Sequence, residues 1–264
     1  MHGTFTTPGA GPIRFVHFAE YHAPWQAQNI LRWKELVRQF RPHLAVDSGD
    51  MMDNGNNFSE WRAWFEQGEG WLTNLFMLPA YSNHVPFNGG DNYTLNLFQL
   101  PDNDENGVRK QNYSTRYGNV QFLEVGYPVD PLDGVWLQQK VSEANDGVDD
   151  PLFLIASWHH PSRLVSNVPF IEPYGGVDMI LVGHDKRTEV SKKAGAGRNG
   201  LDVWNVQTAM GLLSPRPRTA NGYTVQYTND IQRTMLFVEI NGRTLSATVK
   251  DWDGNSLYSF QIVK

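Results

Sequence analysis

The chain has 264 residues, of which 40% are hydrophobic and 19% are charged, so it can bury a sizeable core as one large domain or two small ones. Its formal net charge of −6 argues against a general nucleic-acid binder. The absence of cysteine excludes disulfides and thiolate metal ligands, and no apolar stretch approaches the roughly 20 residues that a membrane span needs.

Residues 1–12 are rich in Thr, Gly and Pro and are predicted to form an N-terminal arm, followed by a single domain over residues 13–264. The first residues lack the basic-then-apolar pattern of a signal peptide. We therefore expect a soluble protein that is either cytoplasmic, or secreted or periplasmic after removal of a leader. The sequence gives no indication of an oligomeric state.

Five apolar runs along the chain each end at polar residues. In an open α/β sheet, the carboxyl ends of parallel strands form the crevice where ligands bind. Strands that deliver Asp, Asn and His to one edge of a sheet therefore predict a metal site there. The runs and their polar followers are Phe15–Ala19 before Glu20 and His22, Leu44–Val46 before Asp50, Phe76–Ala80 before Asn83 and His84, Leu152–Ser157 before His159 and His160, and Met179–Val182 before His184 and Lys186.

Helical periodicity separates several of these runs, at residues 26–40, 58–66 and 134–144, which favours βαβ units and a parallel sheet. The last 60 residues differ, because short alternating runs are joined by the hairpin signals Asn241-Gly242 and Asp253-Gly254. We expect the site at one edge of a central sheet, with an antiparallel C-terminal meander as the second sheet. The predicted fold is mixed α/β, a four-layer α/β/β/α sandwich with two mixed sheets packed face to face between helices.

Several of these segments resemble known motifs. Gly49-Asp50-Met51-Met52-Asp53-Asn54-Gly55 resembles a GD-x-x-x-x-G block, and Ser82-Asn83-His84 resembles Gly-Asn-His. Trp158-His159-His160-Pro161 and the run from Val177 to His184 resemble the last two blocks of the same family. Over nearly its whole length the chain thus resembles the calcineurin-like metallophosphoesterase superfamily, in particular its purple-acid-phosphatase-like branch.

The resemblance implies hydrolysis of phosphate esters at two neighbouring metal ions. One metal position would be held by Asp50, Asn83, His159 and His184, all of which suit a metal. The other would be held by Glu20, His22, Asp50 and the residue at position 186, which is a lysine here where the family has histidine. The general acid would be His84.

Glu20 and Lys186 depart from the family pattern. Glutamate keeps the charge of aspartate, but a lysine ammonium has no lone pair for a metal. Deprotonating it at pH 7 costs about 4.6 kcal/mol, and holding it charged about 4 Å from a divalent ion costs about 8 kcal/mol at an effective dielectric of 20. We therefore expect Lys186 to stay charged in the first metal's place, paired with Glu20 and Asp50. One divalent ion per chain is expected, and the ligands suit Mn, Fe, Zn or Co.

Some of these residues also have a structural explanation. Asp50, Asn83, His159 and His184 would then be a cap, a turn residue and two hydrogen-bonded histidines, although their ordered placement favours metal binding. Glu20 and His22 fit a ligand role and a residual hydrogen-bonded network equally well. We expect Asp53 to cap a turn and His160 to neighbour the site. Arg216 and Arg218 are expected in a solvated loop.

The sequence thus favours a hydrolase that acts on a small-molecule phosphate monoester or diester with a reduced metal set, His84 as acid and Lys186 as a fixed positive charge. The alternative is a binding or surface protein that keeps the fold and has lost the chemistry.

Overall fold

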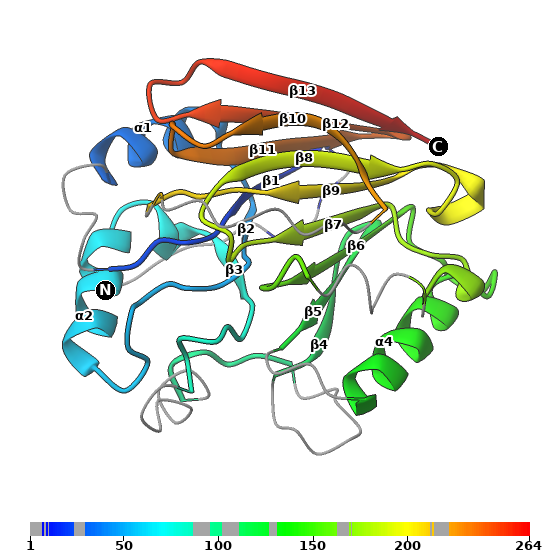
Figure 1. Cartoon of the computed structure of the whole chain (residues 1–264), viewed down its shortest axis with the longest axis horizontal. Coiled ribbons are helices and arrows are strands. Elements are labelled where there is room, and N and C mark those ends of the chain that lie inside the picture. The colour runs from blue at the N-terminus through cyan, green and yellow to red at the C-terminus, as the bar shows by residue number, and fades with distance from the viewer. Residues whose placement is uncertain are drawn as a thin grey trace.

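In the computed structural model two β-sheets face each other between outer helices (Figure 1). The structure describes residues 7, 9, 11–23, 30–86, 96–101, 111–126, 131–162, 169, 171–211, 213 and 222–264. Most of the predicted N-terminal arm, the predicted start of the first helix at Gln26, and Arg216 and Arg218 lie outside these residues. Among the described helices, none is long and apolar enough to cross a membrane.

The first sheet combines three parallel strands from the start of the chain with three antiparallel strands from its end. β1 pairs in parallel with β2, which pairs in parallel with β3, while β11 lies antiparallel to the other edge of β1. Two hairpins then add β12 and β13. The bounds are β1 Ile13–Phe18, β2 Leu44–Asp47, β3 Phe76–Pro79, β11 Thr234–Asn241, β12 Thr244–Asp251 and β13 Ser256–Val263.

The second sheet has seven strands in the order β10-β8-β9-β7-β6-β5-β4. Its centre is parallel, from β5 through β6 and β7 to β9, and its two edges are antiparallel. The bounds are β4 Tyr113–Tyr117, β5 Val120–Val125, β6 Phe153–Trp158, β7 Met179–Val182, β8 Thr188–Lys193, β9 Val203–Gln207 and β10 Thr224–Asn229.

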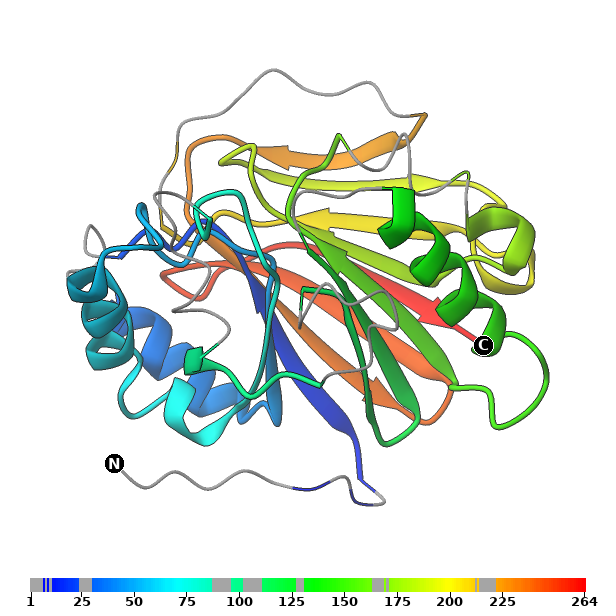
Figure 2. The same ribbon diagram turned by 90° about the horizontal axis from the view of Figure 1, so that it is seen from below.

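Helices cover the outer faces of both sheets (Figure 2). Val16 and Phe18 of β1 pack with Trp33 and Trp61 of α1 and α2 on one side, and Leu123 and Val125 of β5 pack with Trp136 and Leu137 of α4 on the other. The helices are α1 Ile30–Phe40, α2 Phe58–Gly68 and α4 Pro131–Glu143, with short 3-10 turns at Leu72–Asn74, Glu172–Tyr174 and Arg198–Gly200.

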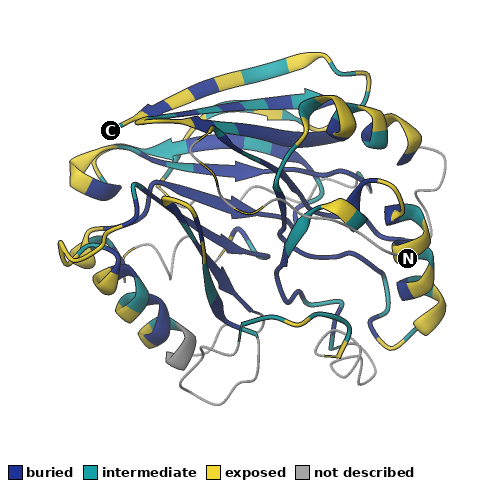
Figure 3. Cartoon of the chain, turned by 180° about the vertical axis from the view of Figure 1, so that it is seen from behind, coloured by how far each residue is buried: buried dark blue, intermediate teal, exposed yellow. Residues whose placement is uncertain are grey.

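The largest hydrophobic cluster lies between the sheets, where Phe15 of β1 meets Phe122 of β5 edge-on with ring centroids 5.5 Å apart. The central strands are buried on both faces, as Figure 3 shows, whereas β13 at the edge alternates between buried and exposed residues. The predicted four-layer α/β/β/α sandwich is therefore confirmed.

The predicted division of strands between the sheets is wrong. The five strands that carry polar followers are not in one sheet, because β1, β2 and β3 belong to the first and β6 and β7 to the second. The predicted C-terminal meander is divided too, since β11–β13 extend the first sheet and β9 joins β7 in parallel. Alternation along a strand indicates its faces, but it does not indicate which edge the strand joins.

A cluster of polar side chains is buried between the sheets just behind the strand ends. His17 Nε2 hydrogen-bonds with Ser48 Oγ at 2.8 Å, and Ser48 Oγ hydrogen-bonds with Ser157 Oγ at 3.0 Å. Burial raises the pKa of Asp47 to about 7, and burial together with the charge of Asp47 raises the pKa of Glu124 to about 8. Glu124 therefore keeps a proton near neutral pH.

We predict that Glu124→Gln changes the pH dependence of stability. Because the pKa of Glu124 in the folded protein is raised from its ordinary value of 4.5 to about 8, the folded state binds more protons than the unfolded state between these two pH values. The wild-type protein thus loses stability as pH rises toward 8, and a glutamine does not contribute to this loss. The free energy of unfolding of the variant, relative to wild type, should rise between pH 5 and 8 in denaturant titrations.

The exposed Glu69 provides the control, since Glu69→Gln should follow the wild-type curve. Parallel curves for Glu124→Gln and wild type across this pH range would show that Glu124 is not protonated in the folded state.

Candidate functional site

The loops that follow β1, β2, β3, β6 and β7 meet at one end of the two sheets. Glu20 N donates to Gly49 O at 3.0 Å within the first sheet, and Gly183 N donates to His159 O at 2.9 Å within the second. His159 Nδ1 donates to Ser48 O at 2.7 Å and joins the two sheets. The structure therefore brings together all the residues that the sequence pattern singled out, at an edge shared by both sheets rather than at an edge of one.

Two glycines allow this close approach of loops. A Cβ on Gly49, whose φ is +102°, would lie 2.5 Å from Ser82 Cβ and 2.8 Å from His159 Nδ1. A Cβ on Gly183 would lie 2.7 Å from Ala19 Cβ. Any side chain at either position would separate the loops, which gives a physical reason for glycine directly before Asp50 and His184.

Backbone strain is concentrated at this edge. Within the described part of the chain, eight residues other than glycine have a positive φ, and five of them lie in the site. Such conformations cost of order 1–3 kcal/mol each and persist where the surrounding structure enforces them, commonly at functional sites. The five residues are Glu20, His22, Asp50, His184 and Lys186.

Four donor atoms form a connected set at the centre of the site. Asp50 Oδ2 lies 3.2 Å from His159 Nε2, which lies 3.3 Å from His184 Nδ1, which lies 3.2 Å from Asn83 Oδ1. Ligands at about 2.0 Å around a tetrahedral metal are about 3.3 Å apart. Neither oxygen of the buried Asp50 carboxylate has a hydrogen-bond partner among the described residues. These residues therefore fit a metal ion.

Asp50 and His159 are strongly coupled by charge. Burial opposes ionisation of Asp50, but the charges of His159, His84 and His22 outweigh burial and lower the pKa of Asp50. Burial likewise disfavours a charged His159, yet the charge of Asp50 raises the pKa of His159 to about 9. Because a histidine must be neutral to bind a metal, metal binding would release this proton.

Glu20 occupies the space beside this set. Its Oε2 accepts from His22 Nε2 at 2.9 Å and its Oε1 accepts from the backbone N–H of His184, so the carboxylate lies between the two histidines. Donor atoms of Glu20, His22 and Asp50 lie within 4.8 Å of one another and could also hold a cation.

The predicted pairing of Lys186 is not what the structure shows. Among the described residues, no ion pair joins the Lys186 ammonium to Glu20 or Asp50, because imidazoles from His22, His84 and His159 surround these carboxylates. Lys186 is nevertheless near, since its charge opposes protonation of His22.

Asp53 lies at the site and contacts two of its histidines, which the sequence analysis did not predict. His22 Nδ1 donates to Asp53 Oδ1 at 2.5 Å, and His84 Nδ1 donates to the Asp53 carbonyl at 2.6 Å. The Nε2 atoms of these histidines therefore face Asp50 Oδ2, at 3.8 Å and 3.6 Å. The N-cap of α2 is Asn57. The sequence feature that could have indicated this role is the position of Asp53, three residues after Asp50.

His160 lies beside the site, as its neighbouring position suggested. Its ring stacks on that of His184 with centroids 3.5 Å apart and planes 28° apart. Donor atoms of His159, His160 and His184 lie within 4.8 Å of one another. His160 therefore packs directly on one member of the donor set.

Comparison with known proteins finds solved structures of similar fold, but no match by sequence. No protein-family model matches the sequence, and no curated protein matches it. A purple acid phosphatase isolated from yellow lupin (Lupinus luteus) seeds superposes with a TM-score of 0.73 at 13% identity, covering 98% of this chain and 55% of that protein. This chain thus spans about half the length of that phosphatase.

Two further structures superpose over nearly the whole chain. GAP50, the anchor in the inner membrane complex of Plasmodium, has a TM-score of 0.69 at 13% identity, with 96% of this chain and 89% of that one covered. PhoD has a TM-score of 0.65 at 10% identity, with 99% and 72% covered. At this identity the likeness shows the fold, and the chain has the fold of the calcineurin-like metallophosphoesterases.

Proposed function

We propose that the chain is a metal-dependent phosphoesterase that hydrolyses a small-molecule phosphate monoester or diester. One divalent ion would be held by Asp50, Asn83, His159 and His184. The observation that carries this proposal is the connected donor set, in which the buried Asp50 oxygens have no hydrogen-bond partner among the described residues. The bound ion would polarise a phosphoryl oxygen and lower the pKa of a water molecule.

His84 is the residue we assign to leaving-group protonation. Its side chain is 19% exposed, whereas those of His22 and His159 are fully buried, so it can reach a substrate. The hydrogen bond from Nδ1 to the Asp53 carbonyl fixes the ring, and a proton for transfer would be held at Nε2. In this proposal Lys186 adds positive charge on the side of His22.

A binding or surface protein with the same fold is the second candidate. The Glu20 carboxylate is held by His22 and by the backbone of His184, an arrangement that needs no metal beside it. The structural likeness to GAP50, described as an anchor, is consistent with this candidate. Metal content and turnover discriminate between the two.

We expect the purified protein to hold close to one equivalent of a transition metal after dialysis and to hydrolyse an aryl phosphate or its diester. A chelator should remove both metal and activity. Asn83→Leu removes one donor and should lose most of the metal, while Asn119→Leu, at an exposed position in the turn between β4 and β5, serves as a control that leaves the donor set intact. Elemental analysis and a chromogenic assay provide the measurements. A folded protein without metal and without turnover would favour the binding protein.

Replacement of His84 by Asn tests the acid. Metal content should stay near that of wild type, and turnover of an ester with a poor leaving group should fall roughly 10²–10⁴-fold, because the leaving oxygen then receives no proton. The loss should be smaller for an aryl ester whose leaving group needs little protonation. Equal losses for the two substrates in steady-state kinetics would give His84 a structural role instead.

The double variant Lys186→His and Glu20→Asp tests the reduced metal set. A neutral imidazole removes the repulsion of the ammonium, and the shorter carboxylate no longer reaches the His184 backbone. We expect a second metal equivalent by elemental analysis and faster turnover, since two ions hold both the attacking and the leaving oxygens. Lys192→His, at a lysine paired with Asp202, is the matched control. One metal and unchanged turnover in the double variant would contradict the assigned role of Lys186.

A further inference from the structure

A second concave site lies at the opposite end of the molecule from the metal-donor set. A cavity of about 540 Å³ opens where residues 150–152 lead into β6 and Arg198–Leu201 lead into β9. His159 follows the other end of β6, so the length of the sheet separates the two sites. None of the candidate metal ligands lines this cavity. Its volume is in the range of small-molecule pockets.

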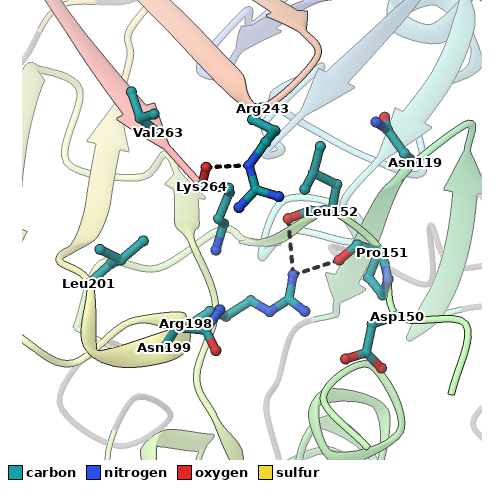
Figure 4. Close-up of a pocket in the computed structure, with 10 residues that line it drawn as sticks. All are labelled: Asn119, Asp150, Pro151, Leu152, Arg198, Asn199, Leu201, Arg243, Val263 and Lys264. Carbon is teal, nitrogen blue, oxygen red and sulfur yellow. Dashed lines mark hydrogen bonds between the residues drawn. The ribbon is translucent and has the colours of Figure 1, made fainter. Parts of the chain in front are cut away.

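Three cationic side chains from separate segments line the cavity, as Figure 4 shows. Arg198 comes from the turn before β9, Arg243 from the turn between β11 and β12, and Lys264 follows β13. The lining contains one carboxylate, Asp150, at the exposed rim. A cluster of cationic side chains at a cavity favours the binding of an anion.

Two of these cations, Lys264 and Arg198, contact the same buried carboxylate. The Lys264 ammonium forms an ion pair with the buried Asp178, and the Arg198 guanidinium lies 3.6 Å from the same carboxylate. Arg198 otherwise donates to neutral oxygens, including Pro151 O at 2.8 Å and Ala144 O at 3.0 Å, which do not balance its charge.

Arg243 is the cation best placed for a ligand. Its Nε donates to Lys264 O at 2.5 Å, which fixes the plane of the guanidinium. Among the described residues, no carboxylate side chain forms an ion pair with Arg243, so its two terminal nitrogens remain donors on the side of the cavity shown in Figure 4. A guanidinium presented in this way binds phosphate or carboxylate through two parallel hydrogen bonds.

The electrostatic cost of assembling these cations supports the same conclusion. Burial lowers the pKa of Lys264, and the charges of Arg198 and Arg243 lower it further, against the effect of Asp178. Closely spaced cations thus destabilise one another, and a bound anion would offset their repulsion.

Apolar side chains form the rest of the wall. Leu152, Leu201 and Val263 line the cavity beside the cations, and Leu201 and Val263 are 36% and 59% exposed. An anion with an apolar body could cover these side chains while its charged group meets Arg243. Inorganic phosphate alone would leave this apolar surface in contact with water.

We propose that this cavity is a binding site for a small organic anion, whose phosphate or carboxylate group is held by Arg243 and Lys264 and whose apolar part packs on Leu152 and Val263. The site is separate from the candidate metal centre and does not depend on the proposed phosphoesterase activity.

The test is titration calorimetry on the full chain after metal removal with a chelator, so that no metal-bound phosphoryl group contributes. The probes are phenylphosphonate, which resists hydrolysis, together with benzoate and inorganic phosphate at constant ionic strength. Phenylphosphonate or benzoate should bind more tightly than inorganic phosphate, and the comparison of the two aromatic probes identifies the preferred charged group.

Arg243→Gln should weaken binding of the better aromatic probe roughly 10- to 100-fold, because hydrogen bonds to charged groups contribute about 1.5–3 kcal/mol. Val263→Glu, which places a negative charge on the wall, should weaken it as well. Arg62→Gln, at an exposed arginine on α2, removes the same surface charge elsewhere and should leave affinity unchanged. Arg243 and Val263 are exposed, so these variants should fold.

Three results would overturn the proposal. They are the absence of binding by all three probes, equal affinity for wild type and Arg243→Gln, and binding that is lost on metal removal or in Asn83→Leu. The last result would place the anion at the metal-donor set instead.

Discussion

The site depends on how closely the loops of the two sheets approach each other. Gly49 and Gly183 leave no room for a Cβ, and the His159 imidazole donates across this contact to Ser48 O of the other sheet. This one hydrogen bond fixes the His159 tautomer and points its Nε2 at Asp50. A carboxylate from one sheet and an imidazole from the other are thereby held 3.2 Å apart, in a place where neither is solvated. The strained backbone of Asp50 and His184 follows from the same packing.

The sequence indicated the site better than it indicated the sheets. Polar residues directly after buried strands were enough to select Glu20, Asp50, Asn83, His159 and His184, because each signal is local. Sheet membership is not local, and the antiparallel pairing of β11 with β1 joins residues more than 200 positions apart. The pairing of Lys186 failed for a related reason. Spacing placed it at the site, but the groups that surround Glu20 and Asp50 are imidazoles brought there by tertiary packing.

The two carboxylates at the centre of the site differ in their hydrogen-bond partners. One oxygen of Glu20 accepts from His22 and the other accepts from the backbone of His184. The carboxylate is therefore neutralised by protein donors, which lessens the need for a cation at that position. Asp50 differs, since both of its oxygens are buried and neither has a hydrogen-bond partner in the part of the chain that the structure describes. The two carboxylates of the site therefore differ in how far protein donors meet their hydrogen-bonding capacity.

The two ends of the sheets also differ in how their charges are satisfied. At the carboxyl ends of the strands, carboxylates and imidazoles alternate. Asp53 is the second carboxylate that contacts His22. The loop that carries Asp53 is held by Glu60, which accepts from the backbone N–H of Asp53 at 2.8 Å. At the opposite end, guanidinium and ammonium groups gather around Asp178, and carbonyl oxygens take most of the hydrogen bonds of Arg198. Buried charge is stable only when it is compensated. At both ends the compensating groups are side chains of the opposite sign, His159 beside Asp50 at one end and Lys264 beside Asp178 at the other.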